Sequence, residues 1–263
     1  MKPFNKLPPP VSAFEGPATL RFSLDNAKLL GTKTAAFSLP AGYSCPGACD
    51  CLAHFDRETN KLVDGPNQKH RCFAASLEAA FTSVRVSVDR NYNLLKAAKT
   101  VEEMTELIHM SLPGVFYENI RIHADGDFYS ANYFLAWCEV ARRNPERIFY
   151  AYTKSLPFWV KYRAIIPKNL VLTASWGGKW DDLIEKNGLR YAKVVLHPEE
   201  AKKLKLKIDH DDSLARDPKA KSFALLIHGM QGAGTEASAA IKRLKAEGVE
   251  YSYGRKSKEK AKP

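Results

Sequence analysis

The chain has 263 residues, of which 45% are hydrophobic and 26% charged, and a formal net charge of +11. This length and composition are those of a globular protein that buries an ample core without disulfide staples, and they exclude collagen-like and disordered classes. No apolar run approaches the ~20 residues of a membrane span, and the Pro-rich start lacks the apolar core of a secretory signal, so we expect a cytoplasmic protein with no membrane partner.

Low-complexity sequence is confined to the two ends of the chain. We therefore divide the chain into three parts. Residues 1–33 form an N-terminal extension, residues 34–253 a single α/β domain with a cysteine loop at 44–73, and residues 254–263 a basic disordered tail.

The first half of the domain is predicted to begin with a strand at 34–39, directly before the cysteine loop. Two helices are expected after the loop, at 74–90 and 94–111, where apolar residues recur at three- and four-residue spacing. They form one long helical connection to the next strand.

Strands and helices alternate regularly from residue 119 onwards. The predicted strands lie at 119–128, 147–155, 169–178, 191–197 and 221–229. The predicted helices lie at 130–145, 157–166, 180–188, 198–204 and 235–248. This alternation requires parallel strands joined by right-handed crossovers. Six strands are too few for a closed eight-stranded barrel, which leaves an open doubly wound sheet or a six-stranded parallel partial barrel.

In either architecture, ligands bind at the carboxyl ends of the strands. The residues that follow the predicted strands are polar, and they predict a pocket for a small molecule or nucleotide. The residues expected to line it are His123, Asp125, Gly126, Asp127, Lys154, His228 and Gln231. A structural explanation stands beside this one, because Asp and Gly after a strand are ordinary turn residues and Asp127 is close enough to Ser130 to compete for a helix cap.

Two further segments have both a functional and a structural interpretation. LLIHGMQGAGTEAS is either an anion site at a helix start or a flexible loop whose Thr235 caps the helix. KIDHDDSLARD offers acidic ligands for a metal, and a solvated loop is the alternative that we favour.

Four of the five cysteines, Cys45, Cys49, Cys51 and Cys72, lie within the cysteine loop. In a reducing cytoplasm such a group indicates metal binding or catalysis rather than disulfides. Thiolates favour zinc or an iron–sulfur cluster, and only the first gap matches the knuckle spacing of zinc sites. A cluster tolerates irregular spacing, so we favour [4Fe–4S], with zinc and no metal as alternatives. Cys138 lies within a predicted helix and is expected in the core.

The excess positive charge is concentrated in the segments HPEEAKKLKLK and SYGRKSKEKAKP. Such lysines either neutralise the phosphates of a nucleic-acid partner or form a solvated face. The sequence does not define an oligomeric state.

Five stretches of the chain resemble a family of actinobacteriophage and bacterial proteins known as gene product 88. They are FSLPAGYSCPGACDCLA, DGPNQKHRCFAAS, RIHADGDFYSANYFLAWCEVARRNP, FYAYTKSLPFW and LLIHGMQGAGTEAS. The resemblance implies a phage-type protein in the host cytoplasm, from a family without an established activity.

The order of strands, helices and cysteines is similar to that of the radical S-adenosylmethionine enzymes. There, three cysteines spaced C-x3-C-x2-C hold a [4Fe–4S] cluster whose fourth iron binds S-adenosylmethionine. This resemblance implies a six-stranded (β/α)6 partial barrel, in which Cys45 and Cys49 match the first spacing and Cys72 is a possible fourth ligand. Our leading hypothesis takes Cys45, Cys51 and Cys72 as the cluster ligands and Cys49 as a possible fourth. The sequence departs from the pattern because Cys51 comes one residue early, and a fourth thiolate would leave no iron open to S-adenosylmethionine.

These observations lead to three hypotheses. The first is a phage-type iron–sulfur protein with a ligand pocket, either an enzyme or an inactive relative. The second is a non-catalytic zinc-containing protein that binds nucleic acid or a host partner. The third is a zinc-dependent hydrolase or nuclease that uses the His and Asp residues of the second strand.

Overall fold

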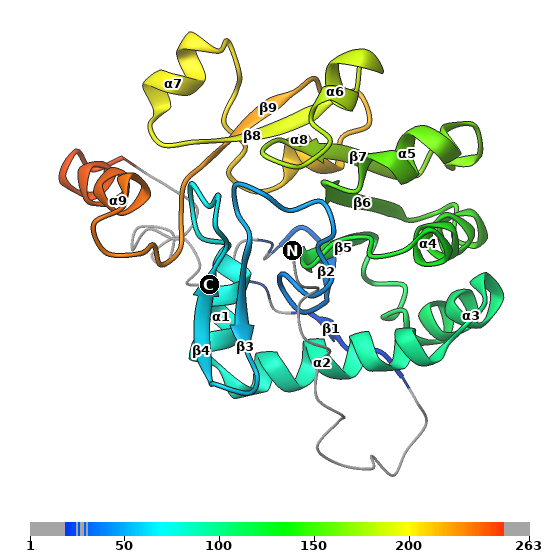
Figure 1. Ribbon diagram of the computed structural model, residues 1–263. Helices are drawn as coiled ribbons and strands as arrows, with labels where there is room; N and C mark the ends of the chain where they lie inside the picture. Colours follow the sequence, from blue (N-terminus) through cyan, green and yellow to red (C-terminus); the bar gives the residue numbers. More distant parts are fainter. Residues whose placement is uncertain (1–18, 25, 27–28, 30, 250–263) are drawn as a thin grey trace.

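A seven-stranded sheet in the order β1-β2-β5-β6-β7-β8-β9 forms the centre of the molecule (Figure 1). The computed structural model describes residues 19–24, 26, 29 and 31–249. The strands of the sheet are β1 (Phe22–Ser23), β2 (Thr34–Ser38), β5 (Asn119–Asp125), β6 (Ile148–Thr153), β7 (Leu170–Ser175), β8 (Tyr191–Val195) and β9 (Phe223–Leu226). A separate hairpin, β3 (Ala53–Asp56) and β4 (Lys61–Asp64), lies within the cysteine loop. The predicted tail at 254–263 falls outside the described residues.

The prediction of a six-stranded parallel partial (β/α)6 barrel like that of the radical S-adenosylmethionine enzymes is wrong. Strands β2 and β5 to β9 pair in parallel and in chain order, but β1 pairs antiparallel with β2, so the sheet is mixed and has seven strands. Sequence patterning missed β1 because two residues show no alternation. Within the described part of the chain, no strand pairing joins β9 to β1 or β2.

The connection between the hairpin and β5 is helical and consists of α1 (Phe73–Ala80), α2 (Thr82–Ala97) and α3 (Val101–Ser111). The sequence predicted two helices here, at 74–90 and 94–111, whereas the structure has three, with breaks at other residues. Phe81 adopts an extended conformation with φ of −128° and separates α1 from α2, which then continues to Ala97. At the start of α3, the Thr100 side chain accepts from the Glu103 backbone N–H and the Glu103 carboxylate accepts from the Thr100 N–H, which forms a capping box.

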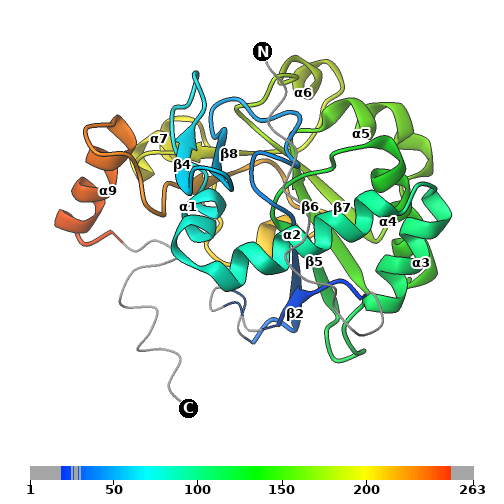
Figure 2. The same cartoon turned by 60° about the horizontal axis from the view of Figure 1, so that its bottom comes forward.

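Each of the strands β5 to β9 is followed by a helix, as the sequence predicts. The helices are α4 (Ala131–Arg143), α5 (Leu156–Tyr162) with a 3-10 turn (Arg163–Ile165), α6 (Asp182–Lys186), α7 (Pro198–Lys203), the unpredicted α8 (Ser213–Arg216), and α9 (Glu236–Ala246). Ser130 caps α4 by accepting from the Tyr133 N–H. In both overall views, α3, α4 and α5 lie on one side of the molecule, while α1, the hairpin and α9 lie on the other (Figures 1 and 2).

Alternation along β5 places isoleucines on one face of the sheet and an arginine on the other. Ile120 and Ile122 belong to a buried apolar cluster that also contains Trp137 and Cys138 of α4, so the expectation that Cys138 is a core residue is confirmed. Arg121 lies between the two isoleucines and points to the opposite face, because successive side chains of a strand alternate. The second face is therefore able to carry polar groups.

A buried ionic group ties the hairpin to α1 and α2. The Arg57 guanidinium donates to Glu78 Oε2 of α1 at 2.6 Å and to both carboxylate oxygens of Asp89 of α2 at 2.6 and 3.0 Å. The Arg57 side chain is 6% exposed and that of Glu78 is 0% exposed. Glu78 Oε1 also accepts from the backbone N–H of Ala41, just before the cysteine loop, at 2.7 Å. The group therefore fixes the beginning of the cysteine loop to the helices that follow it.

Replacing Arg57 by methionine keeps the length of the side chain but leaves the Glu78 carboxylate buried without its cation. We expect R57M to lower the free energy of unfolding by about 3 kcal/mol in urea denaturation, because removing one partner of a buried ion pair is strongly destabilising. Arg143→Met is the control: Arg143 pairs with Glu106 and Glu139 at the surface, and such pairs contribute about 0–1 kcal/mol. Equal losses for the two variants would contradict a structural role for the buried pair.

Candidate functional site

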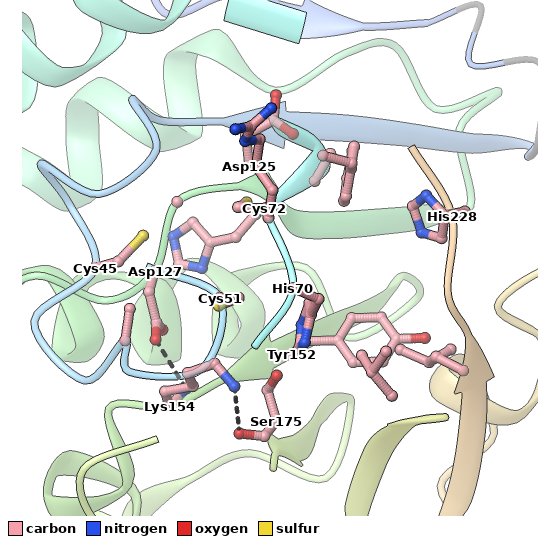
Figure 3. A pocket seen from close by; sticks show the side chains of 18 of the residues that line it. Cys45, Cys51, His70, Cys72, Asp125, Asp127, Tyr152, Lys154, Ser175 and His228 are labelled. Atoms are coloured by element: carbon pink, nitrogen blue, oxygen red, sulfur yellow. Dashed lines mark hydrogen bonds between the residues drawn. The ribbon is translucent and has the colours of Figure 1, made fainter. Parts of the chain in front are cut away.

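A cavity of about 180 Å³ lies where the carboxyl ends of β5, β6 and β7 meet the cysteine loop (Figure 3). Ligands of parallel sheets bind at this edge. The side chains that give the cavity its chemistry are those of Cys45, Cys51, His70, Cys72, Arg121, His123, Asp125, Asp127, Tyr152, Lys154, Ser175, Asp209, Asp212 and His228.

The cavity brings together most of the residues that the sequence predicted for a pocket. His123, Asp125, Gly126, Asp127, Lys154 and His228 line it. Gln231 does not. Its side-chain oxygen accepts from the Arg71 N–H at 2.7 Å, and its side-chain nitrogen donates to the carbonyls of Arg71 and His228 at 3.2 and 3.0 Å. Gln231 thus connects the end of the cysteine loop to the segment after β9.

Three of the four predicted metal ligands, Cys45, Cys51 and Cys72, line the cavity, and their sulfur atoms lie around the same space in Figure 3. Cys49 belongs to the same loop but is not part of the cavity wall. Burial raises the pKa of the Cys45 and Cys72 thiols, and the nearby Cys51 thiol raises both pKa values further. Cys45 and Cys72 are therefore neutral thiols near pH 7 unless a cation replaces their protons.

Backbone contacts hold the cysteine loop against the turn that follows β7. The Asp50 N–H donates to the Gly177 carbonyl at 2.9 Å, and the Lys179 N–H donates to the Gly47 carbonyl at 3.0 Å. A Cβ atom at Gly47 would lie 2.4 Å from the carbonyl oxygen of Lys154, so only glycine fits there. The loop approaches the ends of the strands closely because it has no side chain at this point.

His123 occupies a strained position at an irregularity between β2 and β5. Its φ is +64°, in the left-handed region that non-glycine residues rarely adopt, and the register of β2 against β5 shifts beside it. The imidazole Nε2 lies 3.0 Å from the Tyr133 hydroxyl, whereas Nδ1 is buried without a hydrogen-bond partner among the described residues. Burial lowers the pKa of His123 to about 3, so the ring is neutral. This irregularity thus places His123 in the wall of the cavity, with one ring nitrogen lacking a hydrogen-bond partner in the described residues.

The carboxylate of Asp127 links the end of β5 to the end of β6. Oδ1 accepts from the Phe128 N–H at 2.7 Å and from the Thr153 hydroxyl at 2.6 Å, and Oδ2 accepts from the Lys154 N–H at 2.8 Å. Burial raises the pKa of Asp127 to about 6 although these hydrogen bonds oppose the shift. With its two oxygens engaged in this way, Asp127 positions its neighbours and is a poor candidate for acid–base work.

Asp125 differs from Asp127 because its Oδ1 is buried without a partner in the described part of the chain. Burial raises the pKa of Asp125 to about 6, against the opposing effect of Arg121. The following Gly126 has φ of +88°, and a Cβ atom there would lie 2.6 Å from Leu39 Cβ and from Ser44 Oγ. Gly126 therefore lets β5 turn past the start of the cysteine loop, and Asp125 is the carboxyl group of this turn that is open to a ligand.

Sequence analysis missed the buried ion pair at one side of the cavity. Arg121 Nη1 lies 2.9 Å from Asp212 Oδ2, and the hydroxyls of Tyr150 and Tyr152 donate to the same carboxylate at 3.2 and 3.3 Å. The preference for a solvated loop at KIDHDDSLARD is wrong for Asp209 and Asp212, which are 3% and 0% exposed. The sequence did hold a signal for this pair. Arg121 lies within a buried strand, and a buried arginine requires an anion beside it.

The described residues contain no group of three or more His, Cys, Asp and Glu side chains spaced for one metal ion. Cys45, Cys51 and Cys72 share the wall of the cavity.

Other predicted features lie away from the cavity. Thr235 caps α9 by accepting from the Ser238 N–H at 3.2 Å, as one interpretation of the glycine-rich segment expects. The lysines of the basic segment are exposed and do not line the cavity; they are Lys202, Lys203, Lys205 and Lys207. Within the described ranges, no helix is both long enough and apolar enough to cross a bilayer. A nucleic-acid partner stays a prediction.

Replacing His123 by glutamine tests the burial of a neutral imidazole. In the folded chain His123 gains a proton only near pH 3, whereas in the unfolded chain it does so near pH 6.5, so acid favours unfolding. We expect the stability advantage of wild type over H123Q to shrink by about 1.4 kcal/mol for each pH unit between 6 and 4.5, measured by urea denaturation. An advantage that does not change with pH would mean that the folded imidazole titrates normally.

A family model described as "Gene product 88" matches residues 14–245. Two proteins named "Gene 88 protein", from Mycobacterium phage L5 and Mycobacterium phage D29, are 31% and 30% identical to this chain over 132 residues. These matches cover 45% of this chain and 47% of each relative, so the chain spans about half the length of the curated relatives it matches. No solved structure gives a significant match. Because the family model covers most of its length, the chain belongs to the gene product 88 family.

Proposed function

We propose that this chain binds an iron–sulfur cluster, of the [4Fe–4S] type, through Cys45, Cys51 and Cys72, beside a pocket for a small molecule or nucleotide. The observation that carries the proposal is that these thiols, from two separate parts of the cysteine loop, line one cavity at the carboxyl ends of the strands. Thiolates are soft ligands that bind iron–sulfur clusters and zinc in preference to hard cations.

The spacing of the cysteines along the sequence favours a cluster over a single zinc ion. Zinc sites usually space their ligands as paired C-x2-4-C knuckles, and only the gap from Cys45 to Cys49 has that spacing. In a cluster each thiolate binds its own iron, so the cysteines need no such regular spacing. The host cytoplasm, where thiols are kept reduced, is the compartment that suits such a site.

When bound, a cluster with three protein thiolates supplies one-electron chemistry and an iron that is open to a ligand. The remaining residues of the cavity would bind and orient that ligand. Asp125 Oδ1 and His123 Nδ1 are buried atoms without a partner among the described residues, and each is able to accept a hydrogen bond from a ligand. The pair of Arg121 and Asp212 forms a rigid polar wall.

S-adenosylmethionine is the ligand that the sequence resemblance suggests, and the position of Cys49 bears on it. A fourth protein thiolate would occupy the open iron, but Cys49 is not part of the cavity wall. We therefore include S-adenosylmethionine among the small molecules to be tested against the loaded protein, and propose enzymatic activity only if one of them binds.

The proposal predicts the metal content of cysteine variants. Anaerobically purified wild type should be brown and contain about four irons and four sulfides per chain, with little zinc. Cys45→Ser, Cys51→Ser and Cys72→Ser should each lose most of this iron, since each removes one ligand.

Cys49→Ser is the matched control for these variants, because Cys49 lies in the same loop but outside the cavity wall, and Cys138→Ser controls for loss of a core thiol. Both should keep wild-type iron. Circular dichroism shows whether each variant is folded. One zinc per chain in the wild type, or full iron in folded Cys45→Ser, would overturn the proposal.

A further inference from the structure

A buried lysine in the cavity makes no close ion pair, and its charge acts on the Asp127 carboxylate only over a longer distance, where it lowers the pKa of that group. Lys154 is 7% exposed and has no ion pair with a carboxylate among the described residues. Its Nζ donates to the carbonyls of Ser175 and Trp176 at 2.9 and 2.7 Å. An ammonium group has three N–H donors, so one remains after these two bonds. Burying a charge without a close ion pair is unfavourable, and such groups are concentrated at functional sites.

The surroundings of Lys154 hold it in one place. Asp127 Oδ2 accepts from its backbone N–H at 2.8 Å. The cysteine loop packs against its backbone at Gly47, where a Cβ atom would lie 2.4 Å from the Lys154 carbonyl oxygen. Gly178, after β7, packs against its side chain, because a Cβ atom added at Gly178 would lie 3.2 Å from Lys154 Cβ. The ammonium is therefore a fixed cation in the cavity wall, and not a mobile surface charge.

A second cavity adjoins the first at this point. It has a volume of about 660 Å³ and shares His70 and Val194 with the cavity that contains the thiols. Trp176, whose carbonyl holds the Lys154 ammonium, lines the second cavity.

We propose that the remaining N–H of Lys154 binds an oxyanion group, a carboxylate or a phosphate, of the molecule that occupies the cavity. The anion lies close to the junction of the two cavities, and the rest of the molecule extends into one or both of them. This inference deepens the proposed function and rests on it, because the anion is taken to belong to the molecule that the proposed function places beside the cluster. Binding of the anion itself needs no cluster, so the two ideas are tested separately.

The test uses full-length protein freed of iron and zinc, titrated calorimetrically with inorganic phosphate and, separately, with acetate. At least one of these anions should bind, and Lys154→Gln should weaken its binding about tenfold or more, because a charged donor is replaced by a neutral one. Lys179→Gln is the matched control: Lys179 also donates to a backbone carbonyl, that of Pro46 at 2.7 Å, but it is exposed. The control should bind as wild type does. The anion that binds with the higher affinity identifies the chemical class of the ligand.

A second measurement needs no variant and guards against misfolding of Lys154→Gln. Acetic anhydride labelling, quantified for each lysine by mass spectrometry, should slow at Lys154 but not at Lys179 when the binding anion is present. The proposal is overturned if neither anion binds at millimolar concentration, if folded Lys154→Gln binds as wild type does, or if labelling of Lys154 is unaffected. Absence of iron from the anaerobic protein would instead count against the cluster alone.

Discussion

The buried carboxylate of Asp127 is the interaction on which the candidate site depends. It accepts from the Phe128 and Lys154 backbone and from the Thr153 hydroxyl, and so joins the ends of β5 and β6. Because it fixes the backbone of Lys154, it also fixes the surface on which Gly47 and the cysteine loop are packed. The position of the thiols therefore follows from a hydrogen-bonded carboxylate at the edge of the sheet, supported at a distance by the pair of Arg57 and Glu78.

The cavity combines groups that are costly to bury alone. Desolvation keeps Cys45 and Cys72 protonated, leaves His123 neutral and raises the pKa of two carboxyl groups. A cationic metal centre would favour the thiolate forms, and an anionic ligand group would offset the charge of Lys154. Under the proposed function, both partners would offset part of the free-energy cost of burying these groups.

Local sequence patterns predicted the parts of the fold that depend on local properties. The six parallel strands and their following helices were found because each is a buried run next to an amphipathic one, and Ser130 and Thr235 cap helices as expected. Strand β1 was missed because it is too short to show a period. The break at Phe81 was missed because no Gly or Pro marks it.

The site was only partly predictable, for a different reason. Polar residues after strands indicated His123, Asp125 and Lys154, since the end of a strand is a local property. The burial of Asp212 depends on Arg121, which is distant in sequence, and that of His70 depends on the fold of the cysteine loop. Cys49 was set apart as only a possible fourth ligand, but the sequence could not show that it lies outside the cavity wall, because the fold of the loop decides which side chains reach the cavity.

The most direct test of the account is anomalous diffraction at the iron absorption edge from crystals of anaerobically purified protein. The account predicts iron density in the cavity, bonded to the sulfur atoms of Cys45, Cys51 and Cys72, with Cys49 unbonded. Iron or zinc held elsewhere, or a metal bonded to Cys49 in place of one of the three, would contradict it.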